Sequence, residues 1–190
     1  TIEFTKGHGT GNDFILILDK PGQLALSKDE VKKMCDRHFG IGADGLIIVK
    51  PTSKAPEVSH LLEAEPGAEW FMDYRNSDGS EAEMCGNGIR VFAKFLLENN
   101  LATLTDGSTL PIATRDGIKD VTATVNGFAV DLGLFTIGDD ETLVSAAGLQ
   151  VARPGLEINV GNPHVVVALA DLTELTGLEL VKAPLLEPVQ

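Results

Sequence analysis

Residues 87–99, NGIRVFAKFLLEN, predict a helix that is buried on most of its sides. Arg90, Lys94 and Glu98 follow one another at a spacing of four residues and form one narrow polar stripe. Nearly all the other positions are apolar. Because a helix of this kind must be covered on all its apolar sides, we expect strands to wrap around it.

Apolar or alternating runs on both sides of this helix predict those strands. They span residues 14–18, 46–49, 69–74, 110–114, 121–125 and 128–132. Asx-Gly pairs at 116–117 and 126–127 are signals for tight turns between the later runs. A capping box of Ser27 and Glu30 opens a second helix that extends to about residue 38, and residues 51–67 are expected to form an exposed excursion. The pattern places the fold in the α+β class.

The same pattern divides the chain into a first lobe, residues 1–130, and the start of a second lobe, residues 131–190. Residues 157–160 and 164–168 predict strands in the second lobe, and a short helix is expected to begin at Asp171. Residues 183–190 contain no closing element. We therefore expect the second lobe to be incomplete in this chain.

The formal net charge is −13, which argues against nucleic acid or an anionic membrane as a partner. No apolar run approaches the roughly 18 residues of a membrane span, and the first residues lack the pattern of a signal peptide. The two cysteines, Cys35 and Cys85, are therefore expected to be free thiols in a reducing cytoplasm. Cys35 lies beside Met34 on the apolar face of its helix, where a thiol acts as a small hydrophobic group.

The segment that best fits a reactive site is residues 76–88, NSDGSEAEMCGNG, in which Cys85 stands immediately before the buried helix. The first N–H groups of a helix have no partner within it and carry the positive end of the helix dipole. Such a position favours a thiolate and can hold a carboxylate. Gly86, Gly88 and an N-cap at Asn87 favour a functional cysteine over a buried structural one, because glycines let a ligand approach the backbone closely.

Residues 6–14, KGHGTGNDF, and 161–164, GNPH, also place glycine and asparagine beside an apolar strand. Taken singly, Asn12 and Asn162 fit ordinary turns equally well, and His164 fits an interior histidine with a hydrogen-bond partner better than it fits a catalyst. The glycine spacing in residues 6–14 matches neither a P-loop nor a dinucleotide-binding fingerprint.

Together, residues 6–14, 37–45, 73–90 and 161–164 resemble the diaminopimelate epimerase family, and they occur in the family's order. The string DGSEAEMCGNG at 78–88 is the most specific part of the resemblance. The resemblance implies two similar lobes, each with strands wrapped round a central helix, and an active site between them. It also implies a cytoplasmic homodimer without cofactor or metal that interconverts LL- and meso-diaminopimelate, a precursor of lysine and peptidoglycan.

In this family two cysteines act at the α-carbon: one thiolate removes the proton, and the other, as a thiol, returns one to the opposite face. The resemblance makes Cys85 one of these bases. It assigns the α-carboxylate to Gly86 and Asn87 and the tuning of the cysteine pair to His164. Recognition of the substrate, chiefly of its distal end, falls to Asn12, Asn76 and Asn162. Gly45 stands where many family members have glutamine, so we expect one substrate contact there to be lost or replaced.

The family's second cysteine segment has no counterpart in the 190 residues. Nothing around Cys35 resembles a site at the start of a helix. We therefore expect the chain to be a fragment and predict that it does not epimerise by itself.

Three alternatives stay open. A proline racemase or a phenazine-biosynthesis-type isomerase would share the fold, although the three asparagines and the CGNG string favour the epimerase. A cysteine hydrolase would use Cys85 as the nucleophile and His8 or His164 as the base. A non-catalytic remnant of the fold is supported only by the missing second cysteine.

Overall fold

The computed structural model describes residues 2–105, 107–160, 163–179 and 181–188. The chain forms two compact units, residues 1–132 and 133–190. This division lies close to the boundary expected at residue 130, while the truncation of the second lobe stays a prediction.

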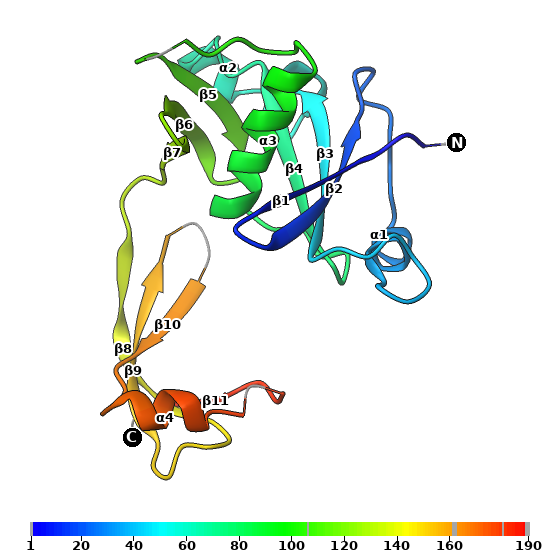
Figure 1. Cartoon of the computed structure of the whole chain (residues 1–190). Coiled ribbons are helices and arrows are strands. Elements are labelled where there is room, and N and C mark those ends of the chain that lie inside the picture. The colour runs from blue at the N-terminus through cyan, green and yellow to red at the C-terminus, as the bar shows by residue number, and fades with distance from the viewer. Residues whose placement is uncertain (1, 106, 161–162, 180, 189–190) are drawn as a thin grey trace. The chain divides into compact units, whose positions relative to one another are not determined.

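The first unit contains a seven-stranded sheet whose spatial order follows the sequence (Figure 1). Its strands are β1 (Thr5–Gly9), β2 (Asn12–Leu18), β3 (Gly45–Pro51), β4 (Trp70–Asn76), β5 (Thr109–Thr114), β6 (Gly117–Thr124) and β7 (Gly127–Asp131). The pairs β2–β3 and β4–β5 are parallel, and the other neighbours are antiparallel. The strands expected from the sequence are all present, and β1 is an additional one.

Helix α3 (Gly86–Glu98) lies inside the curl of this sheet (Figure 1). It contacts β1, β2, β3, β4 and also β7, so both edge strands of the sheet reach the same helix. Ile89, Phe92 and Leu96 are fully buried against the strands, and each contributes roughly 1.5–3 kcal/mol by its burial. The predicted α+β fold, with strands wrapped round a central helix, is confirmed.

The outer face of the sheet carries α1 (Lys28–Cys35), which begins at the predicted capping box of Ser27 and Glu30. Successive residues of a strand point to opposite faces, so Phe14 packs towards α3 while Ile15 packs towards α1. This two-sided burial explains the continuous apolar runs in the sequence. The helix ends at Cys35 instead of about residue 38, because Asp36 has extended backbone angles and its carboxylate accepts from the N–H groups of His38 and Phe39.

Residues 51–67 differ from the exposed excursion that the sequence predicts. They include a 3-10 turn η1 (Thr52–Lys54) and a short helix α2 (Leu61–Ala64). Ala55 and Val58 are buried against Phe71 of β4 in a small third core. Alanine and valine spaced three residues apart among polar neighbours gave too weak a signal for this packing.

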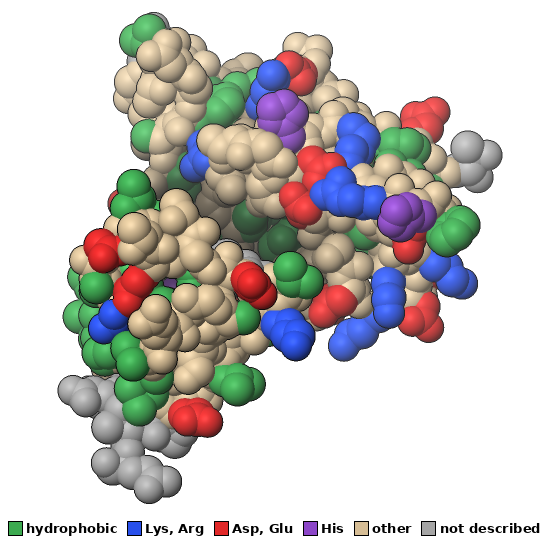
Figure 2. Space-filling model, turned by 60° about the horizontal axis from the view of Figure 1, so that its bottom comes forward, with side chains coloured by type: hydrophobic (Ala, Val, Ile, Leu, Met, Phe, Trp, Pro, Cys, Tyr) green, Lys and Arg blue, Asp and Glu red, His purple; other side chains and the backbone are tan. Residues whose placement is uncertain are grey.

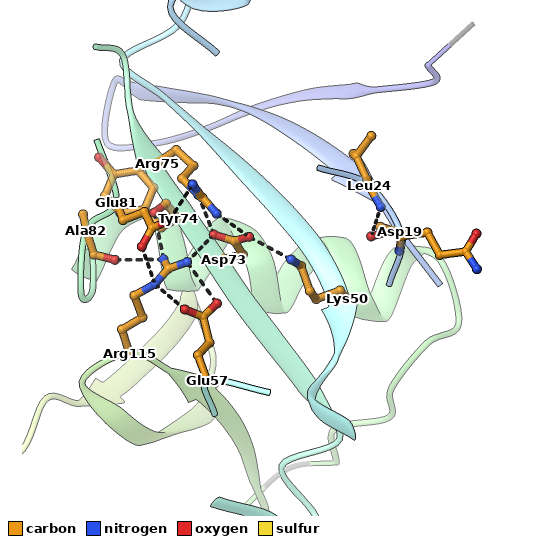
Figure 3. Close-up of polar contacts among 11 residues, drawn as sticks. Asp19, Leu24, Lys50, Glu57, Asp73, Tyr74, Arg75, Glu81, Ala82 and Arg115 are labelled. Atoms are coloured by element: carbon orange, nitrogen blue, oxygen red, sulfur yellow. Dashed lines mark hydrogen bonds and ion pairs between the residues drawn. The ribbon is translucent and has the colours of Figure 1, made fainter. Parts of the chain in front are cut away.

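An ion cluster also occupies the outer face, centred on the fully buried carboxylate of Asp73 in β4 (Figure 3). Lys50, Arg75 and Arg115 lie 2.9, 2.7 and 2.7 Å from its oxygens. Burial works against the ionised form, but the hydrogen bonds from these three cations outweigh it and lower the pKa of Asp73. Arg115 also donates to the carbonyl oxygen of Ala82 at 3.4 Å, which ties the segment before Cys85 to the sheet.

The second unit contains a four-stranded antiparallel sheet in the order β10-β9-β8-β11. Its strands are β8 (Thr136–Ser145), β9 (Arg153–Asn159), β10 (Pro163–Val167) and β11 (Leu185–Pro188), and helix α4 (Leu172–Gly177) begins after the N-cap Asp171. Strands β9 and β10 lie near the predicted segments, whereas β8 and β11 were not expected. No residue of α4 is buried.

Candidate functional site at the start of helix α3

Cys85 is itself the N-cap of α3, with backbone angles of −142° and 115°. The prediction that Asn87 caps the helix is therefore wrong: the cysteine turns the chain into the helix, and its sulfur accepts from the N–H of Gly88 at 3.4 Å. Among the described residues, the N–H groups of Gly86 and Asn87 have no acceptor. The half-buried sulfur thus adjoins two free backbone donors at the positive end of a helix.

Asn87 is instead held by its side chain. Its Oδ1 accepts from Thr10 Oγ1 at 2.9 Å and from the Arg90 guanidinium. Thr10 and Gly11 form the two-residue turn between β1 and β2, with φ angles of 53° and 87°, as a type I′ hairpin turn requires. The side chain is thereby fixed to a neighbouring turn while the backbone N–H stays available to a ligand.

The β1–β2 turn also places Asn12 beside the sulfur. Cys85 Sγ lies 3.8 Å from Asn12 Oδ1, at a sequence separation of 73 residues. The amide nitrogen of Asn12 donates to Asp44 Oδ2 at 2.8 Å. Asn12 is therefore in contact with the candidate base itself, in addition to the role at the distal end of a substrate that the resemblance implies.

Behind Asn12, the segments around residues 6–13 and 37–44 form a surface ion cluster. Arg37 lies 2.7 Å from both Asp13 and Asp44, and Lys6 lies 2.8 Å from Asp13. The hydrogen bond from Arg37 is the largest cause of the lowered pKa of Asp13, and the hydrogen bond from Asn12 is the largest cause of the lowered pKa of Asp44. The face in Figure 2 likewise shows acidic and basic side chains next to one another. Positive potential at the site is thus left to backbone N–H groups and to Arg90.

Asn76 ends β4 and is held by two side-chain hydrogen bonds. Its Oδ1 accepts from the Tyr74 hydroxyl at 3.0 Å, and its Nδ2 donates to Ser80 Oγ at 3.0 Å. Burial raises the pKa of Tyr74, and the nearby Cys85 raises it further. Tyr74 therefore remains a neutral phenol beside the site.

Tyr74 also accounts for Gly45. A Cβ at Gly45 would lie 2.6 Å from Tyr74 Cε2 and 2.8 Å from the carbonyl oxygen of Arg75. The tyrosine ring thus occupies space that any side chain at position 45 would need. No sequence pattern connects these two residues, although Tyr74 is the only tyrosine of the chain.

The other predicted site residues lie in the second unit or outside the described residues. His164 is exposed on β10, paired with Ile158 of β9. Asn162 lies outside the described residues. Their roles beside Cys85 stay predictions.

Cys35 has none of the features of Cys85. It is 4% exposed at the end of α1, and burial raises the pKa of its thiol. In the described part of the chain, no group of three or more His, Cys, Asp or Glu side chains is arranged to hold a metal ion. None of the described helices is long and apolar enough to cross a membrane.

The sequence model of the family described as diaminopimelate epimerase matches residues 4–137. The diaminopimelate epimerase of Streptomyces coelicolor is 44% identical over 176 residues, which cover 90% of this chain and 57% of the relative. Those of Rhodococcus opacus and Thermobifida fusca are 39% and 40% identical, with 98% and 97% of this chain and 66% and 65% of the relatives covered. The chain thus spans 57–66% of the length of these relatives.

Two solved structures share the fold. A probable proline racemase from Agrobacterium radiobacter, with bound carbonate, has a TM-score of 0.63 at 11% identity. The matched part covers 93% of this chain and 53% of the racemase chain. A hydroxyproline epimerase from Agrobacterium vitis, with bound trans-4-hydroxy-L-proline, has a TM-score of 0.63 at 10% identity, with 92% and 53% covered. At such low identity the likeness shows the fold alone.

Proposed function

Because this chain belongs to the diaminopimelate epimerase family, we propose that the whole protein interconverts LL- and meso-diaminopimelate without pyridoxal phosphate, and that Cys85 is one of its two cysteine bases. One observation carries the proposal: the sulfur of Cys85 is the N-cap of a buried helix, next to the free N–H groups of Gly86 and Asn87. A location in the cytoplasm and a homodimer stay predictions.

The free N–H groups suit the α-carboxylate of an amino acid. A carboxylate bound there accepts hydrogen bonds from Gly86 and Asn87 and places the α-carbon next to Cys85 Sγ. When the α-proton leaves, negative charge spreads from the α-carbon into this carboxylate. The same donors then bind more strongly than in the ground state, and one well-aimed donor contributes roughly 3–4 kcal/mol to such a transition state.

The proton transfer needs two sulfurs. The Cys85 thiolate takes the α-proton while the C–H electron pair remains on carbon, and a second cysteine delivers its S–H proton to the opposite face. Cys85 ends as a thiol and its partner as a thiolate, so the total charge is unchanged. The reverse reaction exchanges their roles.

The two cysteines of this chain cannot form that pair in the arrangement observed, because Cys35 is buried in the α1 core. Within the 190 residues we therefore assign one base only. Asn12 and Asn76 fit contacts to the substrate, and we extend the same role to Asn162 and the tuning of the cysteines to His164.

The test is α-proton exchange and inversion in heavy water, followed by NMR on the whole protein with diaminopimelate and, as the competing substrate, proline. We expect inversion of diaminopimelate only. Cys85→Ala should lower the inversion rate by roughly 10²–10⁴-fold, and the matched variant Cys35→Ala should stay within a few-fold of the parent.

Undiminished inversion by Cys85→Ala would refute the role of Cys85, and inversion of proline instead would refute the substrate. The 190-residue chain should show no inversion of either amino acid.

A further inference from the structure

The carbonyl oxygen of Asn12, and not its NH2 group, faces the sulfur of Cys85. The Oδ1–Sγ distance is 3.8 Å. An amide can present either end to a neighbour, so something must select this orientation.

Asp44 supplies that selection. Its Oδ2 accepts from Asn12 Nδ2 at 2.8 Å and from the backbone N–H of Asp13 at 3.1 Å. Its Oδ1 accepts from Arg37 at 2.7 Å. An ionised carboxylate has no hydrogen to donate, so Asn12 must turn its NH2 group to Asp44 and its oxygen to Cys85.

The two contacts of the sulfur consequently favour opposite protonation states. The Gly88 N–H, 3.4 Å away, donates to sulfur and favours the thiolate. Asn12 Oδ1 can only accept, so it pairs with the S–H of the thiol and repels the thiolate. A residue that removes a proton in one direction and returns it in the other needs both states within reach.

We propose that Asp44 is a positioning residue for Cys85: it fixes the Asn12 amide with its oxygen towards the sulfur and thereby stabilises the thiol against the thiolate. The inference builds on the role proposed for Cys85, but its test measures the state of the sulfur and not turnover. A failure of either can therefore be recognised separately.

Two ionisable groups near the sulfur, Tyr74 and Asp44, each keep one protonation state where a thiol titrates. Tyr74 on β4 stays neutral because burial raises its pKa. Arg90 on α3 binds Asn87 Oδ1, and Asp44 is ionised because the hydrogen bond from Asn12 lowers its pKa. Five more ionisable groups lie nearby. Lys6, Asp13 and Arg37 belong to the ion cluster behind Asp44. Cys35 and Asp78 contribute to the raised pKa of Tyr74.

The experiment measures the rate of Cys85 alkylation by iodoacetamide from roughly pH 6 to 10. It uses the 190-residue chain, and mass spectrometry of the peptide that contains Cys85 separates this thiol from Cys35. Asp44→Ala frees the Asn12 amide, and Asn12→Ala removes the acceptor. Each should lower the midpoint of the rate–pH curve by about half a pH unit, which is roughly a threefold faster reaction below the midpoint.

A double-mutant cycle separates this route from the charge of Asp44. If Asp44 acts through Asn12, Asp44→Ala should cause no further change in an Asn12→Ala background. An equal shift in both backgrounds would show that the charge acts directly and would overturn the proposal.

Asp13→Asn is the matched control, because it removes a charge from the same ion cluster without touching the Asn12 side chain. A shift as large as that of Asp44→Ala would also overturn the proposal. Circular dichroism identifies any variant that fails to fold. If Asp44→Ala is one of them, Asn12→Ala decides, since an unchanged or raised midpoint contradicts the contact.

Discussion

The two faces of the seven-stranded sheet each carry one cysteine at a helix end, and the two sulfurs have opposite surroundings. Cys35 is the last residue of α1 on the outer face and is enclosed by apolar side chains. Cys85 precedes the first residue of α3 on the inner face, where backbone N–H groups are free. Because the residue type is the same, the helix end and the residues that cover it decide what each thiol can do.

The outer face differs from the inner one in its charges as well. Three cationic side chains contact the carboxylate of Asp73, which is not exposed to solvent. Within the described part of the chain, the N–H groups of Gly86 and Asn87 beside Cys85 have no acceptor. We therefore expect changes on the outer face to alter stability, and changes at the start of α3 to alter chemistry.

The largest expected effect is on the outer face. Asp73→Asn leaves Lys50, Arg75 and Arg115 around a neutral amide and should lower the free energy of unfolding by about 3 kcal/mol. Urea titration followed by circular dichroism measures it. Glu81→Gln is the control in the same cluster: Glu81 is half-exposed, so its loss should cost less than about 1 kcal/mol. Equal losses of stability in the two variants would mean that burial does not determine how much a carboxylate of this cluster contributes to stability.

The same carboxylate should make stability depend on pH. The pKa of Asp73 is lowered in the folded protein, so its contribution is present above the unfolded value of about 4 and is lost as pH falls below that value towards the folded one. Thermal unfolding between roughly pH 6 and 2 should therefore show a steeper acid loss for the parent chain than for Asp73→Asn. Parallel curves for the two proteins would contradict this assignment.

The reactivity of the two thiols gives the next largest difference. In the folded chain, iodoacetamide should modify Cys85 on the order of 100-fold faster than Cys35, because only Cys85 is accessible without local unfolding. In strong denaturant the two rates should converge, which makes the unfolded chain its own control. Comparable rates in the folded chain would contradict the expected difference in accessibility between the two thiols.

Serine substitution should lower stability at Cys35 and activity at Cys85. Cys35→Ser buries a hydroxyl in an apolar core and should cost about 1–3 kcal/mol of stability. Cys85→Ser should change stability by less than about 0.5 kcal/mol, because serine is a preferred N-cap residue, yet it should lower the inversion rate of the whole protein by roughly 10²–10⁴-fold. Thermal melts of both variants measure the two changes in stability. A large loss of stability in Cys85→Ser would argue that the sulfur has a packing role.

The smallest effect on stability is expected at Gly86. A Cβ there would have Leu132 Cδ1 as its neighbour at 4.0 Å, so Gly86→Ala should change stability by no more than about 0.5 kcal/mol. The methyl group would enter the proposed carboxylate site, and KM for diaminopimelate should rise severalfold. Gly45→Ala is the structural counterpart, because the collision with Tyr74 should cost about 1–3 kcal/mol. An unchanged KM in Gly86→Ala would contradict the proposal that the substrate carboxylate binds at this position.

Much of the first unit follows from local patterns in the sequence. The apolar surround of residues 87–99 predicts a buried helix, and the two Asx-Gly turns predict the β5–β6–β7 meander, because hydrophobic periodicity and turn chemistry act over a few residues. The second unit was less predictable. Neither β8 nor β11 shows a clear alternation of apolar and polar residues, and several apolar residues of this unit, among them Leu156, Val166 and Leu186, are exposed.

The position of Cys85 at the start of α3 also follows from local sequence, since the glycines and the apolar helix are adjacent to it in the chain. The three-dimensional structure adds that Cys85 is the cap, that Asn12 turns its oxygen to the sulfur, and that Tyr74 fills the space at Gly45. The last two contacts join segments that are tens of residues apart. Their geometry depends on strand order and register, which no local pattern specifies.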